Sequence, residues 1–307
     1  MSNKELYFRT SSEIEANLER LKAGRVYVQF FAIFVDPTVP DHEKWAYACE
    51  QIELFHTEVI GNNPEMKHIQ KWAQLANLQE GEIGAVLTLE GAEPIGADLD
   101  KLIYLYEEGI LSVGLTWNKA NLCADGALEQ RHNGLTPFGE RVISLNNDYG
   151  ILTDVSHLSE LSFWDVIDRA AYVFASHSNV RTICEHPRNL SDIQLNALFV
   201  KGGMVNVTFY PPFINEFYEG IDVTTDDVIR HIEYICSLGG TDRIGFGSDF
   251  DGIDLYVDDL QNASQYAAFI TKLQTYYSEE EVRGFASENV MSFLSQIDSS
   301  LSKGGIT

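Results

Sequence analysis

Short apolar segments alternate with amphipathic segments along most of this chain. The apolar segments are rich in β-branched and aromatic residues, and they cover residues 25–34, 82–90, 111–117, 152–157, 173–177, 203–209 and 243–249. The segments between them place apolar residues at the three- and four-residue spacing of helices. The pattern predicts parallel strands connected by helices, which is the arrangement of an α/β protein.

Helix-start signals support this alternation. We expect helices over residues 41–60, 64–75, 98–108, 159–169 and 225–238, and further helices after Thr136 and Ser191. Pro137 follows Thr136 at a favoured first helical position, and Ser278 with Glu281 has the spacing of a capping box. Residues 118–135 form a loop rich in Asn, Gly and Ala, and a connection of this length indicates a functional loop.

Seven strand–helix units can be counted in this pattern, one short of a TIM-like (β/α)8 barrel. A doubly wound open sheet is the alternative. No G-x-G-x-x-G motif follows any strand, and polar residues end several strands, so the barrel is favoured. The unbroken apolar character of residues 25–34 predicts a strand buried on both faces. No linker or repeat divides the chain, which predicts one domain over residues 1–307.

Two neighbouring strands are predicted to end in a histidine. Residues 152–157 read Leu-Thr-Asp-Val-Ser-His, and residues 173–177 read Val-Phe-Ala-Ser-His, with one helix between them. The ends of parallel strands meet at the same edge of a sheet, so His157 and His177 should lie together. A lone histidine is more often an ordinary core residue, but a pair at equivalent positions indicates metal ligands.

Charged residues are predicted at the same edge. Glu90 ends the strand over residues 82–90, and a strand-end carboxylate beside two imidazoles suits Zn²⁺ or a similar divalent ion. Asp249 ends the strand over residues 243–249, where its alternative role is to cap a turn. Arg188 follows Pro187 just beyond His177, where it could bind a substrate carboxylate or, alternatively, form a surface ion pair.

Composition restricts the partners. The chain has 46 acidic and 21 basic residues and a net charge of -25, which disfavours nucleic acid and anionic membrane surfaces. The 4 cysteines include no C-x-x-C pair, which favours reduced thiols in a cytoplasmic protein. No apolar run reaches the about 18 residues of a membrane span, and no apolar signal core follows Met1.

Five motifs in this order resemble the membrane (renal-type) dipeptidases, the M19 metallopeptidases. The motifs are Leu-Thr-Leu-Glu90-Gly, Asp154-Val-Ser-His157, Ala-Ser-His177-Ser-Asn, Pro-Arg188-Asn and Gly-Phe-Gly-Ser-Asp249-Phe-Asp-Gly. The resemblance covers the chain from about residue 17 onward. It implies a metal-dependent barrel that hydrolyses dipeptides with a metal-activated water, that tolerates a C-terminal D-residue, and that forms a homodimer.

The resemblance also implies roles for particular residues. In such enzymes two zinc ions share a bridging glutamate, which corresponds to Glu90, and two histidines of one ion correspond to His157 and His177. The residue that binds the free carboxylate corresponds to Arg188, and the acid/base that contacts the substrate amine corresponds to Asp249. Zn²⁺ is therefore the expected cofactor, with Mn²⁺ or Co²⁺ as alternatives.

Two departures from the family pattern affect these expectations. No His-x-Asp pair, which holds the other metal in the family, occurs in this sequence, so the chain could hold one ion. Trp117 stands where mammalian members have a histidine that positions the scissile carbonyl. Trp117 and Asn118 are therefore predicted to contact substrate, with the Asn118 amide as the hydrogen-bond donor to that carbonyl.

The missing pair leaves a second hypothesis open, namely a catalytically impaired barrel that binds a peptide or small molecule. An amidohydrolase-type lactonase is disfavoured, because the usual strand-end lysine ligand has no candidate. Without a further strand, residues 25–34 and 243–250 would each expose an unpaired edge. We therefore expect that Met1 is an internal or misassigned start and that about 20–30 in-frame upstream codons encode a short apolar strand ending in His-x-Asp.

Overall fold

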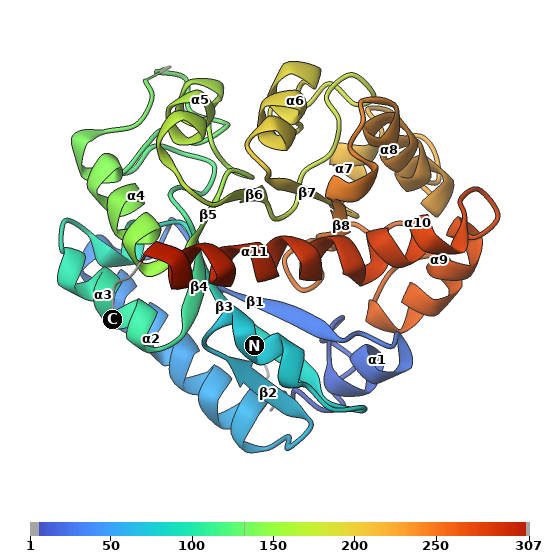
Figure 1. Ribbon diagram of the computed structural model, residues 1–307, viewed down its shortest axis with the longest axis horizontal. Helices are drawn as coiled ribbons and strands as arrows, with labels where there is room; N and C mark the ends of the chain where they lie inside the picture. Colours follow the sequence, from blue (N-terminus) through green and yellow to red (C-terminus); the bar gives the residue numbers. More distant parts are fainter. Residues whose placement is uncertain (1–5, 132, 305–307) are drawn as a thin grey trace.

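A curled sheet of parallel strands forms the centre of the computed structural model, which describes residues 6–131 and 133–304, with side chains up to residue 298 (Figure 1). The strands are β1 (Val28–Phe34), β2 (Met66–Ile69), β3 (Ile83–Glu90), β4 (Ile110–Gly114), β5 (Leu152–Asp154), β6 (Val173–Ala175), β7 (Met204–Val207) and β8 (Ile244–Phe246). Their order is β1-β3-β4-β5-β6-β7-β8, and β2 pairs with the first half of β3. The predicted α/β, TIM-like class is confirmed, as a curled half-barrel.

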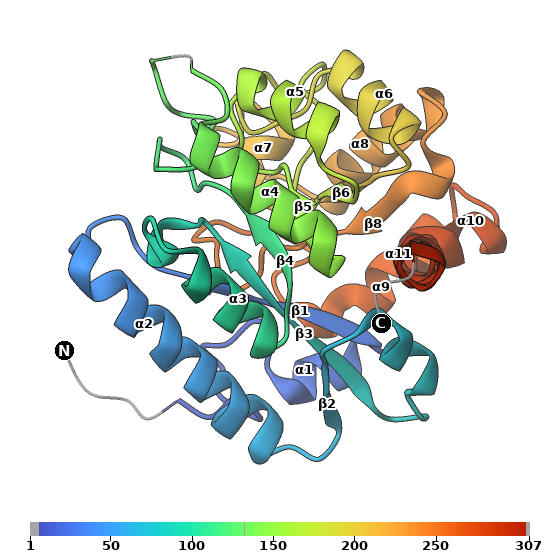
Figure 2. The same cartoon turned by 60° about the vertical axis from the view of Figure 1, so that its left-hand side comes forward.

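Helices cover the outside of this sheet (Figure 2). The α-helices are α1 (Leu18–Ala23), α2 (Asp41–Leu54), α3 (Leu99–Glu107), α4 (Pro137–Tyr149), α5 (Glu160–Arg169), α6 (Asp192–Val200), α7 (Pro211–Ile214), α8 (Thr225–Ser237), α9 (Tyr266–Leu273), α10 (Glu279–Arg283) and α11 (Asn289–Gly304). The short or irregular helices are η1 (Phe55–Gly61), η2 (Trp72–Asn77), η3 (Glu93–Ile95), η4 (Thr241–Arg243), η5 (Ala263–Gln265) and η6 (Gly284–Glu288).

Side-chain caps begin the helices where the sequence predicts them. The Thr136 hydroxyl accepts from the Gly139 amide with Pro137 at the first helical position, and the Ser191 hydroxyl accepts from the Gln194 amide. Ser278 and Glu281 form the predicted capping box at α10. Each cap satisfies amides that the first turn leaves without partners, which fixes where the helix starts.

Two expectations about elements are wrong. Residues 64–75 do not form a helix, because Met66–Ile69 pairs with Ile83–Val86 of β3 and only the following residues turn into the 3-10 helix η2. The pairing to β3 overrides the helical spacing of this segment. The strands before His157, His177 and Asp249 end early, at Asp154, Ala175 and Phe246, so all three side chains lie in the loops just beyond them.

A seam separates the two ends of the sheet. Among the described residues, β1 pairs only with β3 and β8 pairs only with β7, as expected for two unpaired edges. The expected burial of the first strand on both faces is wrong, because only Ile33 of β1 is buried. The residues of β1 instead line a cavity of about 1180 Å³, whose other walls include β8, α9 and α11. Helix α11 crosses this seam (Figure 1).

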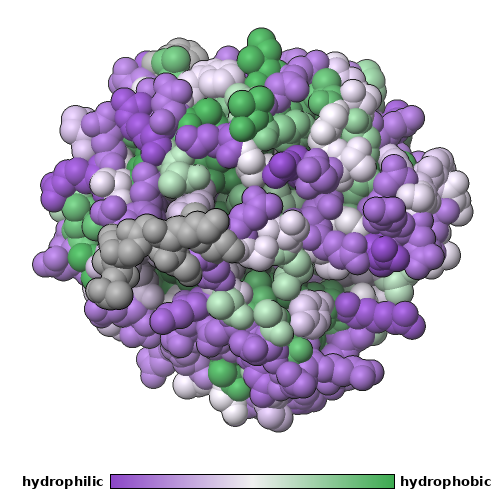
Figure 3. Space-filling view, in the orientation of Figure 1, coloured by the Kyte–Doolittle hydropathy of each residue, from purple (hydrophilic) through white to green (hydrophobic). Residues whose placement is uncertain are grey.

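The surface of this face is mostly hydrophilic, with scattered apolar side chains (Figure 3). None of the described helices has the length and apolarity that crossing a membrane requires.

Candidate active site

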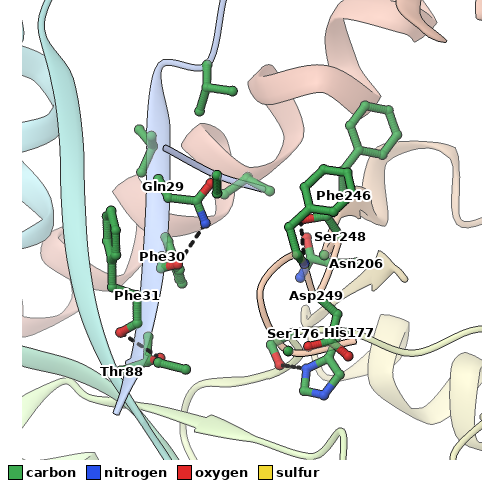
Figure 4. A pocket seen from close by; sticks show the side chains of 18 of the residues that line it. Gln29, Phe30, Phe31, Thr88, Ser176, His177, Asn206, Phe246, Ser248 and Asp249 are labelled. Atoms are coloured by element: carbon green, nitrogen blue, oxygen red, sulfur yellow. Dashed lines mark hydrogen bonds between the residues drawn. The ribbon is translucent and has the colours of Figure 1, made fainter. Parts of the chain in front are cut away.

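The carboxyl ends of the strands bring the predicted site residues together. Glu90 is the last residue of β3, His157 and His177 lie just beyond β5 and β6, and Asp249 follows β8. Arg188 lies between β6 and α6. All five side chains line the same cavity, and so do Trp117 and Asn118. Figure 4 shows His177 and Asp249 at one end of this cavity, below the facing walls of β1 and β8.

Glu90, His157 and His177 form a compact cluster. The Nε2 atom of His157 lies 2.8 Å from Oε1 of Glu90 and 2.9 Å from Nε2 of His177, and the latter lies 3.5 Å from the same Glu90 oxygen. These ligand atoms all lie within 4.8 Å of one another. Two imidazoles and one carboxylate are the donor set that a catalytic zinc ion uses.

The two histidines of the cluster are neutral rings. Burial, with the positive charge of Arg188, lowers the pKa of both His157 and His177 well below the ordinary value. Both rings are therefore neutral near pH 7, and a neutral imidazole offers a nitrogen lone pair to a metal. The three residues fit a divalent cation on the chemistry of their donor atoms and on their proximity.

Arg188 is a buried cation with unused donors. Its side chain is 2% exposed, its Nη2 lies 3.0 Å from Nε2 of His157, and its Nε and Nη1 atoms are buried without partners among the described residues. Burial lowers the pKa of Arg188 to about 10, so the group stays charged at neutral pH. A charged donor that is buried and unsatisfied is costly, so an anionic ligand at this position would be stabilised.

Asp249 has an unusual backbone and an unusual pKa. Its φ is 65°, a left-handed value that is uncommon for residues other than glycine. Burial and the nearby Glu90 carboxylate raise the pKa of Asp249 to about 7, against the opposing effect of Arg188. A carboxyl group that titrates near neutral pH can both accept and release a proton.

Trp117 and Asn118 lie on the other side of the histidines. The Trp117 ring lies 6.2 Å from the His157 ring and 5.3 Å from the Phe34 ring, between centroids. The side-chain oxygen of Asn118 lies 3.0 Å from Nδ1 of His157. Asn118 therefore contacts a candidate metal ligand in this structure.

Sequence reasoning missed a polar cluster behind the histidines, formed by Asp154, Ser156 and Ser176. The Asp154 carboxylate connects the ends of β5 and β6 through these serines. Burial raises the pKa of Asp154, while hydrogen bonds from Ser176 and Ser156 act in the opposite direction. The available signal was the serine that directly precedes each histidine, in Asp154-Val-Ser-His157 and Ala-Ser-His177.

Solved structures with the same architecture are dipeptidases and related enzymes. The chain superimposes on the dipeptidase AC, an M19 metallopeptidase, with a TM-score of 0.88 and 26% identity, covering 94% of this chain and 90% of the other. It superimposes on a metallopeptidase from Rhodobacter sphaeroides, liganded with a phosphinate mimic of the dipeptide L-Ala-D-Ala, with a TM-score of 0.89 and 25% identity, covering 95% and 92%.

Sequence comparison agrees with the structural comparison. The chain is 31% identical over 308 residues to an uncharacterised dipeptidase of Schizosaccharomyces pombe, covering 94% of this chain and 73% of the relative. It is 29% identical over 300 residues to a dipeptidase of Aspergillus oryzae, covering 92% and 70%. The sequence profile of the membrane dipeptidase family matches residues 1–303. The chain therefore belongs to the membrane dipeptidase family, peptidase family M19, and is a peptide-bond hydrolase.

Proposed function

We propose that this chain hydrolyses dipeptides with the help of a divalent cation held by Glu90, His157 and His177. The observation that carries the proposal is the meeting of these three ligands with the unsatisfied cation of Arg188 in one cavity. Zn²⁺ suits the donor set best, and Mn²⁺ or Co²⁺ are alternatives. Such an ion supplies Lewis-acid chemistry and makes water a better nucleophile.

Each remaining residue has a role that follows from its position. Arg188 binds the free carboxylate of the dipeptide, because its buried donors then gain an anionic partner. Asp249 accepts the proton of the attacking water and passes it to the leaving amine, a task that suits its raised pKa. Trp117 forms an apolar wall beside His157.

We also expect the chain to tolerate a D-residue at the C-terminal position of its substrate. The Rhodobacter sphaeroides relative was solved with a mimic of L-Ala-D-Ala. We propose that the present chain also accepts a D-residue at the carboxylate end of its substrate.

The test is hydrolysis of L-Ala-D-Ala and L-Ala-L-Ala by chain loaded with Zn²⁺, Mn²⁺ or Co²⁺, together with the metal content per chain. We expect at least one ion per chain and cleavage of both dipeptides. Absence of cleavage with every metal would overturn the proposal. Tight dipeptide binding without turnover would instead favour the impaired-barrel hypothesis, whose basis is that no His-x-Asp pair occurs in this sequence.

A further inference from the structure

The polar cluster of Asp154, Ser156 and Ser176, called the Asp154 clasp below, connects by hydrogen bonds the two loops that carry the candidate metal-binding histidines. Oδ1 of Asp154 accepts hydrogen bonds from the amides of Ser156 and Ser176, both at 3.0 Å, and from the Ser156 hydroxyl at 2.8 Å. Its Oδ2 accepts from the Ser176 hydroxyl. The Ser156 hydroxyl oxygen accepts from the His177 amide at 3.0 Å. One carboxylate therefore connects the residue before His157 to the residue before His177.

The clasp fixes the direction of the hydrogen bond to the His177 ring. A hydroxyl has one proton to donate, and Ser176 donates it to Asp154, because a carboxylate can only accept. The Ser176 oxygen lies 2.6 Å from Nδ1 of His177 and must then act as acceptor there. Figure 4 shows this contact from Ser176 to the imidazole. The proton of His177 is therefore on Nδ1, and Nε2 carries the lone pair.

The contacts of His157 at Nε2 oppose one another, unlike those of His177 at Nδ1. Nη2 of Arg188, 3.0 Å from Nε2 of His157, can only donate, whereas Oε1 of Glu90, 2.8 Å from the same nitrogen, can only accept. Nδ1 of His157 lies 3.0 Å from the Asn118 side-chain oxygen. The hydrogen bonds of the structure therefore assign a tautomer to His177 and not to His157.

We propose that Asp154 and Ser176 are positioning residues that set the His177 tautomer, so that Nε2 is ready for a metal before the metal binds. The proposal rests on the proposed function for its purpose, but the tautomer can be measured without metal or substrate. Partners behind a metal-binding histidine fix its ring and its tautomer, and their loss typically costs about 10–100-fold in metal affinity. We expect losses in that range here.

Asp154→Asn is the sharpest test, because it keeps the shape of the side chain and replaces one hydrogen-bond acceptor with a donor. Two backbone amides, those of Ser156 and Ser176, require an acceptor at the position of Oδ1. The new amide nitrogen must then face Ser176 and donate to its hydroxyl. Ser176 in turn donates to Nδ1 of His177, which moves the ring proton to Nε2, the nitrogen that should bind the metal.

The measurement is the tautomer of each histidine in metal-free protein, from long-range ¹H–¹⁵N correlation spectra. We expect the Nδ1–H form for His177 in the unmodified chain. In Asp154→Asn, His177 changes to the Nε2–H form, while His157, whose ring contacts Asn118, Arg188 and Glu90, keeps the tautomer that it has in the unmodified chain. Zn²⁺ affinity, from competition with a chelating dye, should fall about 10–100-fold.

Ser156→Ala is the matched control. It removes a hydroxyl that contacts Asp154, the Ser176 hydroxyl and the His177 amide, but not the ring. It should leave the His177 tautomer unchanged, so a shift equal to that of Asp154→Asn would show a merely structural effect and overturn the proposal. Retention of the Nδ1–H form in Asp154→Asn would overturn it too.

Ser176→Ala is the second variant for the same measurement, for use if Asp154→Asn does not fold. It removes the ring acceptor itself, and we expect a mixture of His177 tautomers with an unchanged His157. An unmixed Nδ1–H form in this variant counts against the proposal. Dipeptide hydrolysis is a separate readout, so a chain that shows these tautomers but cleaves no dipeptide would refute the proposed function alone.

Discussion

The β5–β6 corner and the β1–β8 seam build their parts of the site differently. At the corner, β5 and β6 each pair with two neighbours, and the Asp154 clasp joins their ends. At the seam, β1 and β8 each have one strand partner, and β1 lines a cavity. The candidate metal ligands His157 and His177 belong to the corner, whereas Asp249 directly follows β8. The two candidate histidine ligands thus lie beside a connected hydrogen-bond network, and the proposed acid/base residue borders the open side.

The largest effect should follow from removing the carboxylate that faces both histidines. Glu90→Gln keeps the shape but removes the negative charge that contacts both Nε2 atoms. We expect metal affinity to fall by more than the about 10–100-fold cost of losing an outer partner, with loss of hydrolysis. Calorimetric zinc titration measures this. Undiminished affinity would mean that the cluster is not the metal site.

Asp249→Asn should be the next most severe change, because it removes the proposed proton acceptor. We expect kcat to fall about 10²–10⁴-fold with metal content unchanged, since acid/base catalysis contributes that range. Unchanged metal content would show that Asp249, at the seam, is not needed for metal binding, in contrast to the proposed role of His157 and His177 at the corner. A variant with normal kcat would exclude the acid/base role.

The pH dependence of kcat/KM is a second test of the acid/base role of Asp249. Its pKa of about 7 in the metal-free chain lies above the ordinary value, so the side chain is protonated below that pH and ionised above it. A base must be ionised, so kcat/KM should rise with pH, and a bound cation would move the rise to lower pH. A carbon-13 titration of Asp249 in metal-free protein should have its midpoint near 7. In Asp249→Asn the rise should disappear.

Arg188→Met should weaken substrate binding. The change replaces a buried cation with an apolar chain of similar length, and a hydrogen bond to a charged group is worth about 1.5–3 kcal/mol. We expect kcat/KM to fall about 10–150-fold for dipeptides. For a dipeptide amide, which lacks the carboxylate, the two proteins should differ far less. Equal losses for both substrates would argue against carboxylate binding.

The smallest effects concern stability, and they test whether the seam packs less tightly than the closed side. Phe163 in α5 is 0% exposed, so Phe163→Ala should lower the free energy of unfolding by about 3–5 kcal/mol. Phe30 in β1 is only partly buried and already borders the cavity, so Phe30→Ala should cost less, below about 2 kcal/mol. Urea unfolding of both variants measures these changes. Similar losses in the free energy of unfolding would show that the seam is as well packed as the core.

The sequence predicted the features that depend on local pattern. Apolar segments that end in Glu90, His157 and His177 placed these side chains at one edge of the sheet, because parallel strands end together. The caps at Thr136 and Ser191 were predictable for the same local reason. The proton-directing role of Ser176 was not, since it depends on which atom of Asp154, from another strand, faces the hydroxyl.

Tertiary pairing explains the remaining differences. Residues 66–69, taken with the segment that follows, have apolar residues at helical spacing. They nevertheless form β2, because the backbone of β3 pairs with them. The burial of β1 failed for the opposite reason, because most of its residues line a cavity in place of a packed core. Neither the partner that a segment gains nor the partner that it lacks can be read from its own residues.

The position of α11 has a consequence for how the chain folds. This helix packs against η2, from the first third of the sequence, and against β8 and η4 near the last strand. Contacts between segments so distant along the chain form late, because a long loop must close first. On the ribosome α11 emerges after β1 and β8, so the seam between these two strands stays uncovered until α11 has been made. Refolding should therefore compete with aggregation, and its yield should fall as protein concentration rises.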